Sequence, residues 1–420
     1  MELKRVVITG MGALTPLGNN LNDYWEGLKA GVSGAAKITY FDPALHKTQF
    51  ACELKNFNVG NFIDRKEARR MDKFSQYAIV ASDEAIADAG IVEGNYNPDR
   101  VGVIWGSGIG GLETFQEESR GLVQANANGT QPKFNPFFIP KMIVDIACGN
   151  ISIKHGFRGP NFATVSACAS SSHALIDAFT YIRMGKADII VSGGSEAAVN
   201  ETGIGGFNAC MALSTRNDSP ATASRPFDKE RDGFVLGEGA GALIVEEYEH
   251  AVKRCAKIYA EIVGSGMTAD AYHMTAPHPE GLGAMNVMIN ALDDAGMTID
   301  DIDYINVHGT STPLGDVAEL TAIQKVFGEK AYDLNISSTK SMTGHLLGAA
   351  GAIEAIATVL AVQNDFIPPT INHKTPDDQI DQKLNLTLNK GQNRVVKAAL
   401  TNTFGFGGHN ASIVLKKFEQ

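Results

Sequence analysis

The sequence predicts an α/β protein built from two similar halves, and three observations support this prediction. Short apolar runs that end in glycine recur along the chain, as expected for buried strands. Helix-like stretches separate these runs, and such alternation is typical of α/β folds with buried sheets. A β-branched segment followed by tiny residues and an apolar helix occurs once in each half of the chain.

The first series of elements occupies residues 1–257. The runs RVVITG from Arg5, VGVIWGSG from Val101 and ADIIVSGG from Ala187 each predict a strand. Residues 74–90 predict a helix that stops at a glycine, which suits a helix C-terminus. After Ala240, the segment GALIVEEYEHAVKRC predicts a strand followed by a helix.

The second series occupies residues 258–420, where YAEIVGSGM, DYINVHGTST and LNISSTK predict strands. The segments ACASSSHALIDAFTYIRMG and MTGHLLGAAGAIEAIATVLAV, one in each half, both begin with tiny residues that let helices approach closely. We therefore expect two buried central helices in a duplicated α/β unit, with one domain at 1–257 and the other at 258–420.

Composition narrows the classes of function. The 36 lysines and arginines against 47 aspartates and glutamates give a net charge of −11, which disfavours nucleic-acid binding. Five widely spaced cysteines fit neither a disulfide framework nor a zinc ribbon, so we expect reduced thiols and no metal. The N-terminal apolar run is too short for a signal peptide, and the most apolar segment, from Gly348, contains Glu354. We therefore expect a soluble cytoplasmic protein without a membrane span.

Cys168, in TVSACASSS, is the candidate nucleophile. A strand-like segment runs directly into a helix that begins close to this cysteine. The positive end of the helix dipole would lower the thiol pKa and favour the reactive thiolate. The alternative is a small buried residue without a chemical role, as is common for free cysteines.

Two histidines, His308 in NVHGTSTPLGD and His345 in SSTKSMTGHLLGAAG, each follow a strand-like run beside glycine and small hydroxyl residues. Active sites of α/β proteins gather at such strand ends, and two neutral imidazoles can donate to a developing oxyanion. Lys340 and Glu354 flank His345, and we expect them to pair because burying either charge alone is costly. A structural role is the alternative for either histidine.

Two glycine-rich segments allow more than one interpretation. TNTFGFGGHN, from Thr401, predicts either a hinge that carries an aromatic gate or a tight turn that packs aromatics into the core. Gly106, Gly108 and Gly111 fit the G-x-G-x-x-G pattern of dinucleotide-binding proteins. The acidic residue expected about 20 positions later is missing, which disfavours a nicotinamide oxidoreductase.

The motifs SACASSS, NVHGTSTPLGD, SSTKSMTGHLLGAAGA and NTFGFGGHNA, in this order, resemble the β-ketoacyl-[acyl carrier protein] synthases. The resemblance covers nearly the whole chain and is closest to synthase II of bacterial fatty acid synthesis. It implies a thiolase fold, in which duplicated halves form a five-layered α-β-α-β-α protomer that usually assembles as a homodimer. It also implies condensation of an acyl chain with malonyl-[acyl carrier protein].

The resemblance implies roles for individual residues. Cys168 would carry the acyl chain, while His308 and His345 would promote malonyl decarboxylation and stabilise the enolate. Lys340 would support the histidines with Glu354 as its partner. The remaining assignments are an oxyanion-hole N–H and gating ring at Phe406, pantetheine contacts at Thr310 and Thr312, and acyl-pocket positions at Ile109 and Phe207. No cofactor is implied, because phosphopantetheine arrives on the carrier protein.

The segment IDRKEARRMDKF is the candidate docking site for the acidic carrier. At their spacing, Lys66, Arg69, Arg70 and Lys73 would share one helix face. The alternative is an ordinary solvated face. Met211 stands where some family members have arginine, which puts one carrier contact in doubt. A catalytically silent binding subunit is disfavoured by the intact cysteine and histidines.

Overall fold

The computed structural model describes residues 3–419, whose main strands form one ten-stranded sheet in the order β10-β9-β13-β14-β8-β1-β7-β6-β4-β5. The first half of the chain supplies β1 (Val6–Leu14), β4 (Val101–Gly106), β5 (Asn161–Thr164), β6 (Ile189–Glu196) and β7 (Gly239–Glu247). The second half supplies β8 (Ala260–Ala269), β9 (Tyr304–Asn306), β10 (Asn335–Ser337), β13 (Ala398–Gly405) and β14 (His409–Lys417). Two minor ribbons pair β2 (Ala36–Lys37) with β3 (Phe50–Ala51) and β11 (Phe366–Ile367) with β12 (Gln392–Asn393).

The helices also fall into two series. The first comprises α1 (Leu21–Ala30), α2 (Arg65–Ala68), α3 (Lys73–Asp88), α4 (Leu112–Ala127), α5 (Phe138–Met142), α6 (Ile146–His155), α7 (Ser170–Arg183), α8 (Glu201–Ala209) and α9 (Tyr248–Lys253). The second comprises α10 (Leu282–Ala295), α11 (Pro313–Phe327), α12 (Lys340–Thr343) and α13 (Ala350–Asn364).

The two halves repeat one strand topology. When the five main strands of each half are numbered in chain order, both halves have the spatial order 3-2-4-5-1. The first strands of the halves, β1 and β8, pair antiparallel at the centre, where residues 6–8 lie opposite 260–262. The predicted duplication is therefore present as a twofold repeat of the sheet order.

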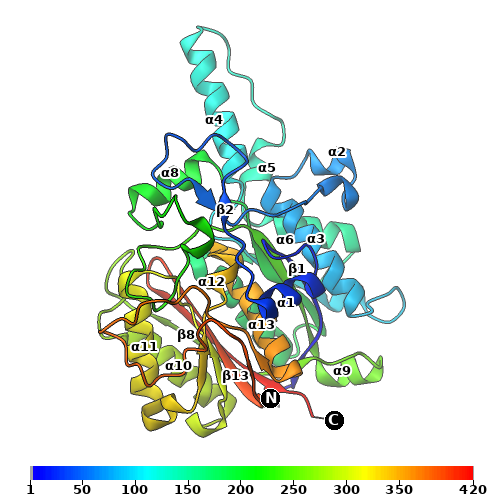
Figure 1. Ribbon diagram of the computed structural model, residues 1–420. Helices are drawn as coiled ribbons and strands as arrows, with labels where there is room; N and C mark the ends of the chain where they lie inside the picture. Colours follow the sequence, from blue (N-terminus) through cyan, green and yellow to red (C-terminus); the bar gives the residue numbers. More distant parts are fainter. Residues whose placement is uncertain (1–2, 420) are drawn as a thin grey trace.

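The layers follow from which face of the sheet each helix covers (Figure 1). Helices α7 and α13 pack against each other and against strands of both halves, which places them in the middle. Helices α3 and α6 cover the outer face of the first half, and α10 covers that of the second half with α11 beside it. This is the predicted five-layered α-β-α-β-α protomer, and both central helices lie where the tiny residues predict them.

Glycine makes the central crossing possible. A Cβ on Gly351 of α13 would lie 2.0 Å from the hydroxyl of Ser172 on α7, so no larger residue fits there. Within the described residues, only the stretch Leu347–Asn364 is long and apolar enough to span a membrane, and 89% of it is buried inside the fold. That stretch is the core helix α13 and the turn before it.

The basic segment departs from the prediction. Helix α2 ends at Ala68, and α3 begins anew at Lys73 because the Asp72 carboxylate caps it by accepting the N–H of Phe74. The prediction that Lys66, Arg69, Arg70 and Lys73 share one helix face is therefore wrong. Lys73 instead pairs with Glu113, 2.9 Å away.

Candidate active site

Cys168 lies at the start of the first central helix, as the sequence predicts. Strand β5 leads into a single 3₁₀ turn at Ala167–Ala169, and α7 follows from Ser170. Ala167 has a left-handed backbone with φ of 50°, a conformation that costs energy for a residue with a side chain. The second half repeats this geometry, with Leu347 at φ of 48° before α13. These two turns face each other at the end of the central helices.

Cys168 and the two histidines form one cluster. The Cys168 Sγ lies 2.9 Å from Nε2 of His345, and the rings of His345 and His308 meet edge to face with centroids 5.3 Å apart. One ligand-type atom from each of the three residues lies within 4.8 Å of the others. The structure therefore brings together three residues that are separated by up to 177 positions in the sequence.

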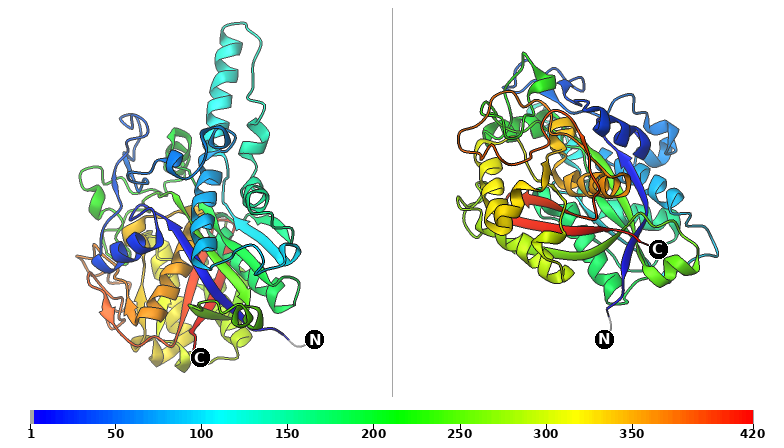
Figure 2. Two further views of the ribbon diagram at one scale, coloured as in Figure 1. Left: turned by 90° about the vertical axis from the view of Figure 1, so that its right-hand side faces the viewer. Right: turned by 60° about the horizontal axis from the view of Figure 1, so that its bottom comes forward.

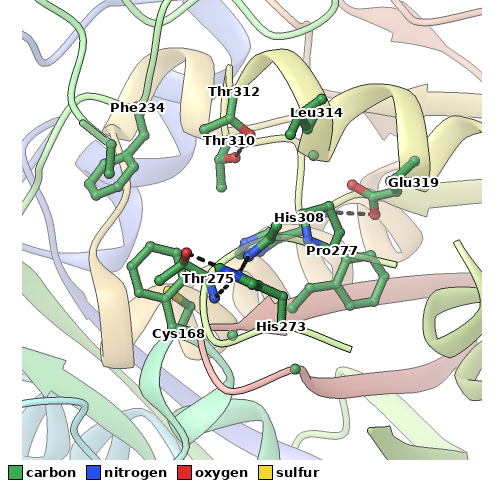
Figure 3. A pocket seen from close by; sticks show the side chains of 18 of the residues that line it. Cys168, Phe234, His273, Thr275, Pro277, His308, Thr310, Thr312, Leu314 and Glu319 are labelled. Atoms are coloured by element: carbon green, nitrogen blue, oxygen red, sulfur yellow. Dashed lines mark hydrogen bonds between the residues drawn. The ribbon is translucent and has the colours of Figure 1, made fainter. Parts of the chain in front are cut away.

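His308 is held by a carboxylate that the sequence analysis did not single out. Glu319, buried on α11, accepts the backbone N–H groups of His308 at 2.9 Å and Gly309 at 2.8 Å (Figure 3). The signal available was an acidic residue in a largely apolar helix, eleven residues after the histidine and three after a second acidic residue, Asp316. Such a residue is as often exposed, so only the fold reveals its partner.

Burial dominates the electrostatics of the cluster. It raises the pKa of the Cys168 thiol to about 12, although Lys340 and the backbone N–H of Phe406 act to lower it. The expectation that the helix start leaves a lowered thiol pKa is therefore wrong for the free enzyme. Burial also holds the pKa of His308 and His345 well below its usual range, with Lys340 adding to the effect, so both imidazoles are neutral.

Lys340 and Glu354 pair as predicted. The Lys340 ammonium donates to the Glu354 carboxylate, and the two side chains are 1% and 0% exposed. Removing one member of such a buried pair typically costs about 3–5 kcal/mol, because the other charge is left uncompensated. The pair thus fixes a positive charge close to the cysteine and histidines.

A cavity of about 520 Å³ opens beside the cluster. The predicted substrate-binding residues Phe207, Thr310 and Thr312 line it, together with Phe406. The hydroxyls of the two threonines lie 3.0 Å apart at the start of α11, and both side chains lie near His308 (Figure 3).

The GFGG segment is the tight turn that one of its two interpretations predicts, whereas the aromatic gate stays a prediction. It forms the tight turn between β13 and β14, with Gly407 and Gly408 at φ of 90° and 76°. Phe406 is half-buried at the wall of the cavity rather than packed into the core. A Cβ on Gly405 would lie 3.2 Å from the backbone nitrogen of Cys168, so this turn rests directly on the cysteine.

Ile109 does not line this cavity, and its side chain is 38% exposed. Its assignment to an acyl pocket stays a prediction. The glycine loop around it is occupied from within, because the carboxylate of Glu196 accepts the N–H groups of Gly108, Ile109 and Gly110. A phosphate would need those same donors, which removes the basis for the dinucleotide alternative.

The carrier-docking candidates lie on the surface. Lys66, Arg69 and Arg70 are exposed, and the Arg70 guanidinium sits over the ring of Phe137, 5.4 Å from its centroid. Met211 is 85% exposed at the cavity mouth and has a left-handed backbone, with φ of 53°. All five cysteines are free.

The three clustered residues are of types that could ligate a metal ion. Lys340 argues against this use, since its buried positive charge acts on all three side chains and would repel a second cation. The same charge and the neutral imidazoles suit a site that stabilises developing negative charge. The arrangement therefore favours a thiol nucleophile beside an anion-stabilising pair of histidines.

Comparison with known proteins decides the family. Residues 3–251 match the model of the β-ketoacyl synthase N-terminal domain, and residues 259–374 match that of the β-ketoacyl synthase C-terminal domain. The chain belongs to the β-ketoacyl synthase family. The resemblance carried by the four motifs is thus confirmed.

Curated relatives match the chain from end to end. A 3-oxoacyl-[acyl-carrier-protein] synthase 2 of Synechocystis is 49% identical, covering 100% of this chain and 99% of the relative. The protein of the same name from Staphylococcus aureus is 51% identical, covering 99% of both chains. The predicted likeness to synthase II is confirmed by these relatives.

Solved structures agree with the fold. A β-ketoacyl synthase from Burkholderia phymatum superposes with a TM-score of 0.91 at 37% identity, covering 99% of this chain and 100% of the other. A ketosynthase solved in complex with its type II polyketide acyl-carrier protein gives 0.89 at 32% identity, with the same coverage. A family member therefore exists in a complex with a carrier protein.

Proposed function

We propose that this chain is a β-ketoacyl-[acyl carrier protein] synthase of fatty acid biosynthesis, acting in the cytoplasm. It condenses an acyl chain with malonyl-[acyl carrier protein] and yields a 3-oxoacyl chain two carbons longer. The observation that carries the proposal is the Cys168–His345 contact of 2.9 Å, with His308 beside it, at the inner end of a cavity. The full-length match to synthase 2 relatives supports the choice of substrate.

The first step is acyl transfer. The resting thiol is protonated because its pKa is about 12, and Nε2 of His345 is close enough to accept the proton as the sulfur attacks. The thioester bond to the carrier breaks, a new thioester forms on Cys168, and the proton passes to the departing pantetheine sulfur. The backbone N–H of Phe406, which faces the Cys168 sulfur, stabilises the carbonyl oxygen with that of Cys168.

The second step is decarboxylation and carbon–carbon bond formation. Malonyl thioester loses CO₂, and the electron pair of the broken bond moves onto the thioester as an enolate. His308 and His345 donate to the enolate oxygen, His345 after its neutral ring has shifted its proton from Nδ1 to Nε2, and the nearby charge of Lys340 adds to this stabilisation. The enolate carbon then attacks the acyl–Cys168 thioester, the bond between the acyl carbon and the sulfur breaks, and the Cys168 thiolate that leaves takes up a proton from solvent. No cofactor of the protein's own takes part in this scheme.

We propose the acidic acyl carrier protein as the partner, with Lys66, Arg69 and Arg70 as its docking residues. Their exposure on an otherwise acidic protein supports this assignment, because complementary charge steers encounter. The broken helix does not remove the patch, since all three residues still face solvent. The carrier complex of the related ketosynthase also supports it.

We further propose a homodimer. Helix α4 and the loop after it stand out from the body of the molecule, with α5 at their foot (Figures 1 and 2), and the apolar side chains there are exposed: Phe115, Leu122, Val123, Phe134, Phe137, Ile139 and Ile143. Nearby strand β5 ends the sheet with one free edge. A second copy would cover both features. Light scattering after gel filtration should give the mass of two chains, and Val123→Glu with Ile139→Glu should shift it toward one.

The test of activity uses purified protein with acyl and malonyl carriers of defined length. The proposal predicts 3-oxoacyl carriers two carbons longer, with one CO₂ released per product. CO₂ release without elongation would indicate a decarboxylating subunit, and neither product would indicate a binding-only role. Comparing acyl lengths in the same assay identifies the preferred chain.

A further inference from the structure

Glu196 is a buried carboxylate at the carboxyl end of β6 that the scheme above does not use. It is 0% exposed, and five donors converge on it. One oxygen accepts the hydroxyl of Ser107 at 3.1 Å and the N–H groups of Ile109 and Gly110 at 3.2 and 3.3 Å. The other accepts the N–H groups of Gly108 at 2.7 Å and Gly348 at 3.0 Å. Burial raises the pKa of this carboxyl, while the hydrogen bonds that it accepts act to lower the pKa by stabilising the ionised form.

The second oxygen joins the two halves of the fold. Gly108 belongs to the loop after β4 in the first half, whereas Gly348 lies in the turn before α13 in the second. The backbones are so close that a Cβ on Gly348 would lie 2.2 Å from the nitrogen of Gly108. A single buried anion therefore bridges two backbone segments that would otherwise present unpaired donors to each other.

Both bridged segments adjoin the reacting groups. Gly348 is three residues from His345, and Leu347 between them has the left-handed backbone already described. A Cβ on Gly108 would lie 3.2 Å from the carbonyl oxygen of Ala167, the residue before Cys168. Glu319 plays a similar part in the second half, where it accepts the backbone N–H groups of His308 and Gly309.

We propose that Glu196 is a positioning residue that fixes Cys168 and His345 relative to each other across the two halves. The inference depends on the proposed function only where its test measures condensation; the alkylation of Cys168 can be measured without it. Its charge also lies close enough to oppose ionisation of the Cys168 thiol. Loss of the carboxylate should therefore alter both the geometry of the cluster and the reactivity of the sulfur.

The test compares Glu196→Gln with Glu246→Gln in the full-length protein. Glu246 is also 0% exposed and lies at the opposite end of the neighbouring strand β7, about 23 Å away at ~3.3 Å per residue. Its partners are Thr9, His250 and Arg254, none of which lines the cavity. E246Q thus controls for the loss of a buried carboxylate without touching the site.

E196Q should lower kcat for condensation about 30–100-fold with little change in KM for the malonyl carrier, since misplacement by about 1 Å can have this effect. The pH profile of Cys168 alkylation by iodoacetamide should move to lower pH in E196Q. E246Q should lower the melting temperature while leaving the alkylation profile and kcat within about twofold of wild type.

An alkylation profile and kcat in E196Q that match those of E246Q would overturn the proposal and leave Glu196 a purely structural residue. If E196Q does not fold, Glu196→Asp provides the test, because aspartate keeps the negative charge but its shorter side chain cannot place the carboxylate at the same point. It should then retain the wild-type alkylation profile and lose kcat. The alkylation measurement needs no carrier substrate, so failure of the proposed function would leave this result interpretable.

Discussion

Replacing His308 with alanine should separate the two chemical steps. His308 lies beside His345 but, unlike it, makes no hydrogen bond to the Cys168 sulfur in the structure. The variant should therefore keep acyl transfer to Cys168 within about threefold while losing one of two donors to the enolate. Removing one preorganised donor costs about 10²–10³ in rate, or roughly 2.7–4 kcal/mol of transition-state stabilisation.

His345→Ala provides the contrast. It removes the second donor and also the group 2.9 Å from the sulfur, so both steps should slow. His308→Gln supplies a side-chain N–H close to the position of the imidazole donor. Its decarboxylation rate should therefore be about tenfold higher than that of His308→Ala. Because burial keeps both imidazoles neutral, the wild-type decarboxylation rate should not fall as pH drops through the usual histidine pKa of about 6.5.

Two assays measure the steps separately. Release of labelled CO₂ from malonyl carrier reports decarboxylation, and mass spectrometry of protein incubated with acyl carrier alone reports acyl transfer. Equal losses of both steps in His308→Ala would refute the division of labour, as would an unchanged rate of decarboxylation.

Three further predictions follow from the site and its surface. Since burial raises the pKa of Cys168 to about 12, iodoacetamide inactivation should accelerate about tenfold per pH unit between pH 7 and about pH 10, and a plateau below about pH 8 would contradict this. Reversing Arg69 and Arg70 to glutamate should raise KM for the carrier and weaken its salt dependence; an unchanged KM at low salt would mean an ordinary solvated surface. Ile109→Phe should exclude long acyl chains while short ones react, as each excluded methylene forfeits about 0.8 kcal/mol; a uniform loss across lengths with a lower melting temperature would instead indicate overpacking.

The architecture could be predicted from the sequence because the two signals that indicate it, apolar runs and tiny residues at helix starts, are local. Buried strands and the two central helices appear as apolar runs and as tiny residues at helix starts, and the structure has them at those positions. The same tiny residues explain the close crossing at Gly351, where even a methyl group would overlap Ser172. The cluster of Cys168, His308 and His345 was also predictable, because each lies in a motif of its own after a strand, although α12 separates His345 from β10.

The features that sequence reasoning missed depend on contacts between distant segments. The helix break before Lys73 comes from Asp72, whose carboxylate also accepts the N–H and hydroxyl of Thr114. Apart from the Ser107 hydroxyl on Glu196, the partners of Glu196 and Glu319 are backbone N–H groups, which leave no trace in residue identity. The pKa of Cys168 depends on how deeply the finished fold buries it, and that burial outweighs its favourable neighbours.

The central claim is that Cys168 carries the acyl chain, and intact-protein mass spectrometry tests it most directly. Wild-type protein incubated with acyl carrier should gain the mass of one acyl group per chain, located on the peptide that contains Cys168. Cys168→Ala should gain none and should not condense, although its fold and its exposed Cys210 are retained. An acyl adduct on another residue, or condensation by Cys168→Ala at the wild-type rate, would contradict the account.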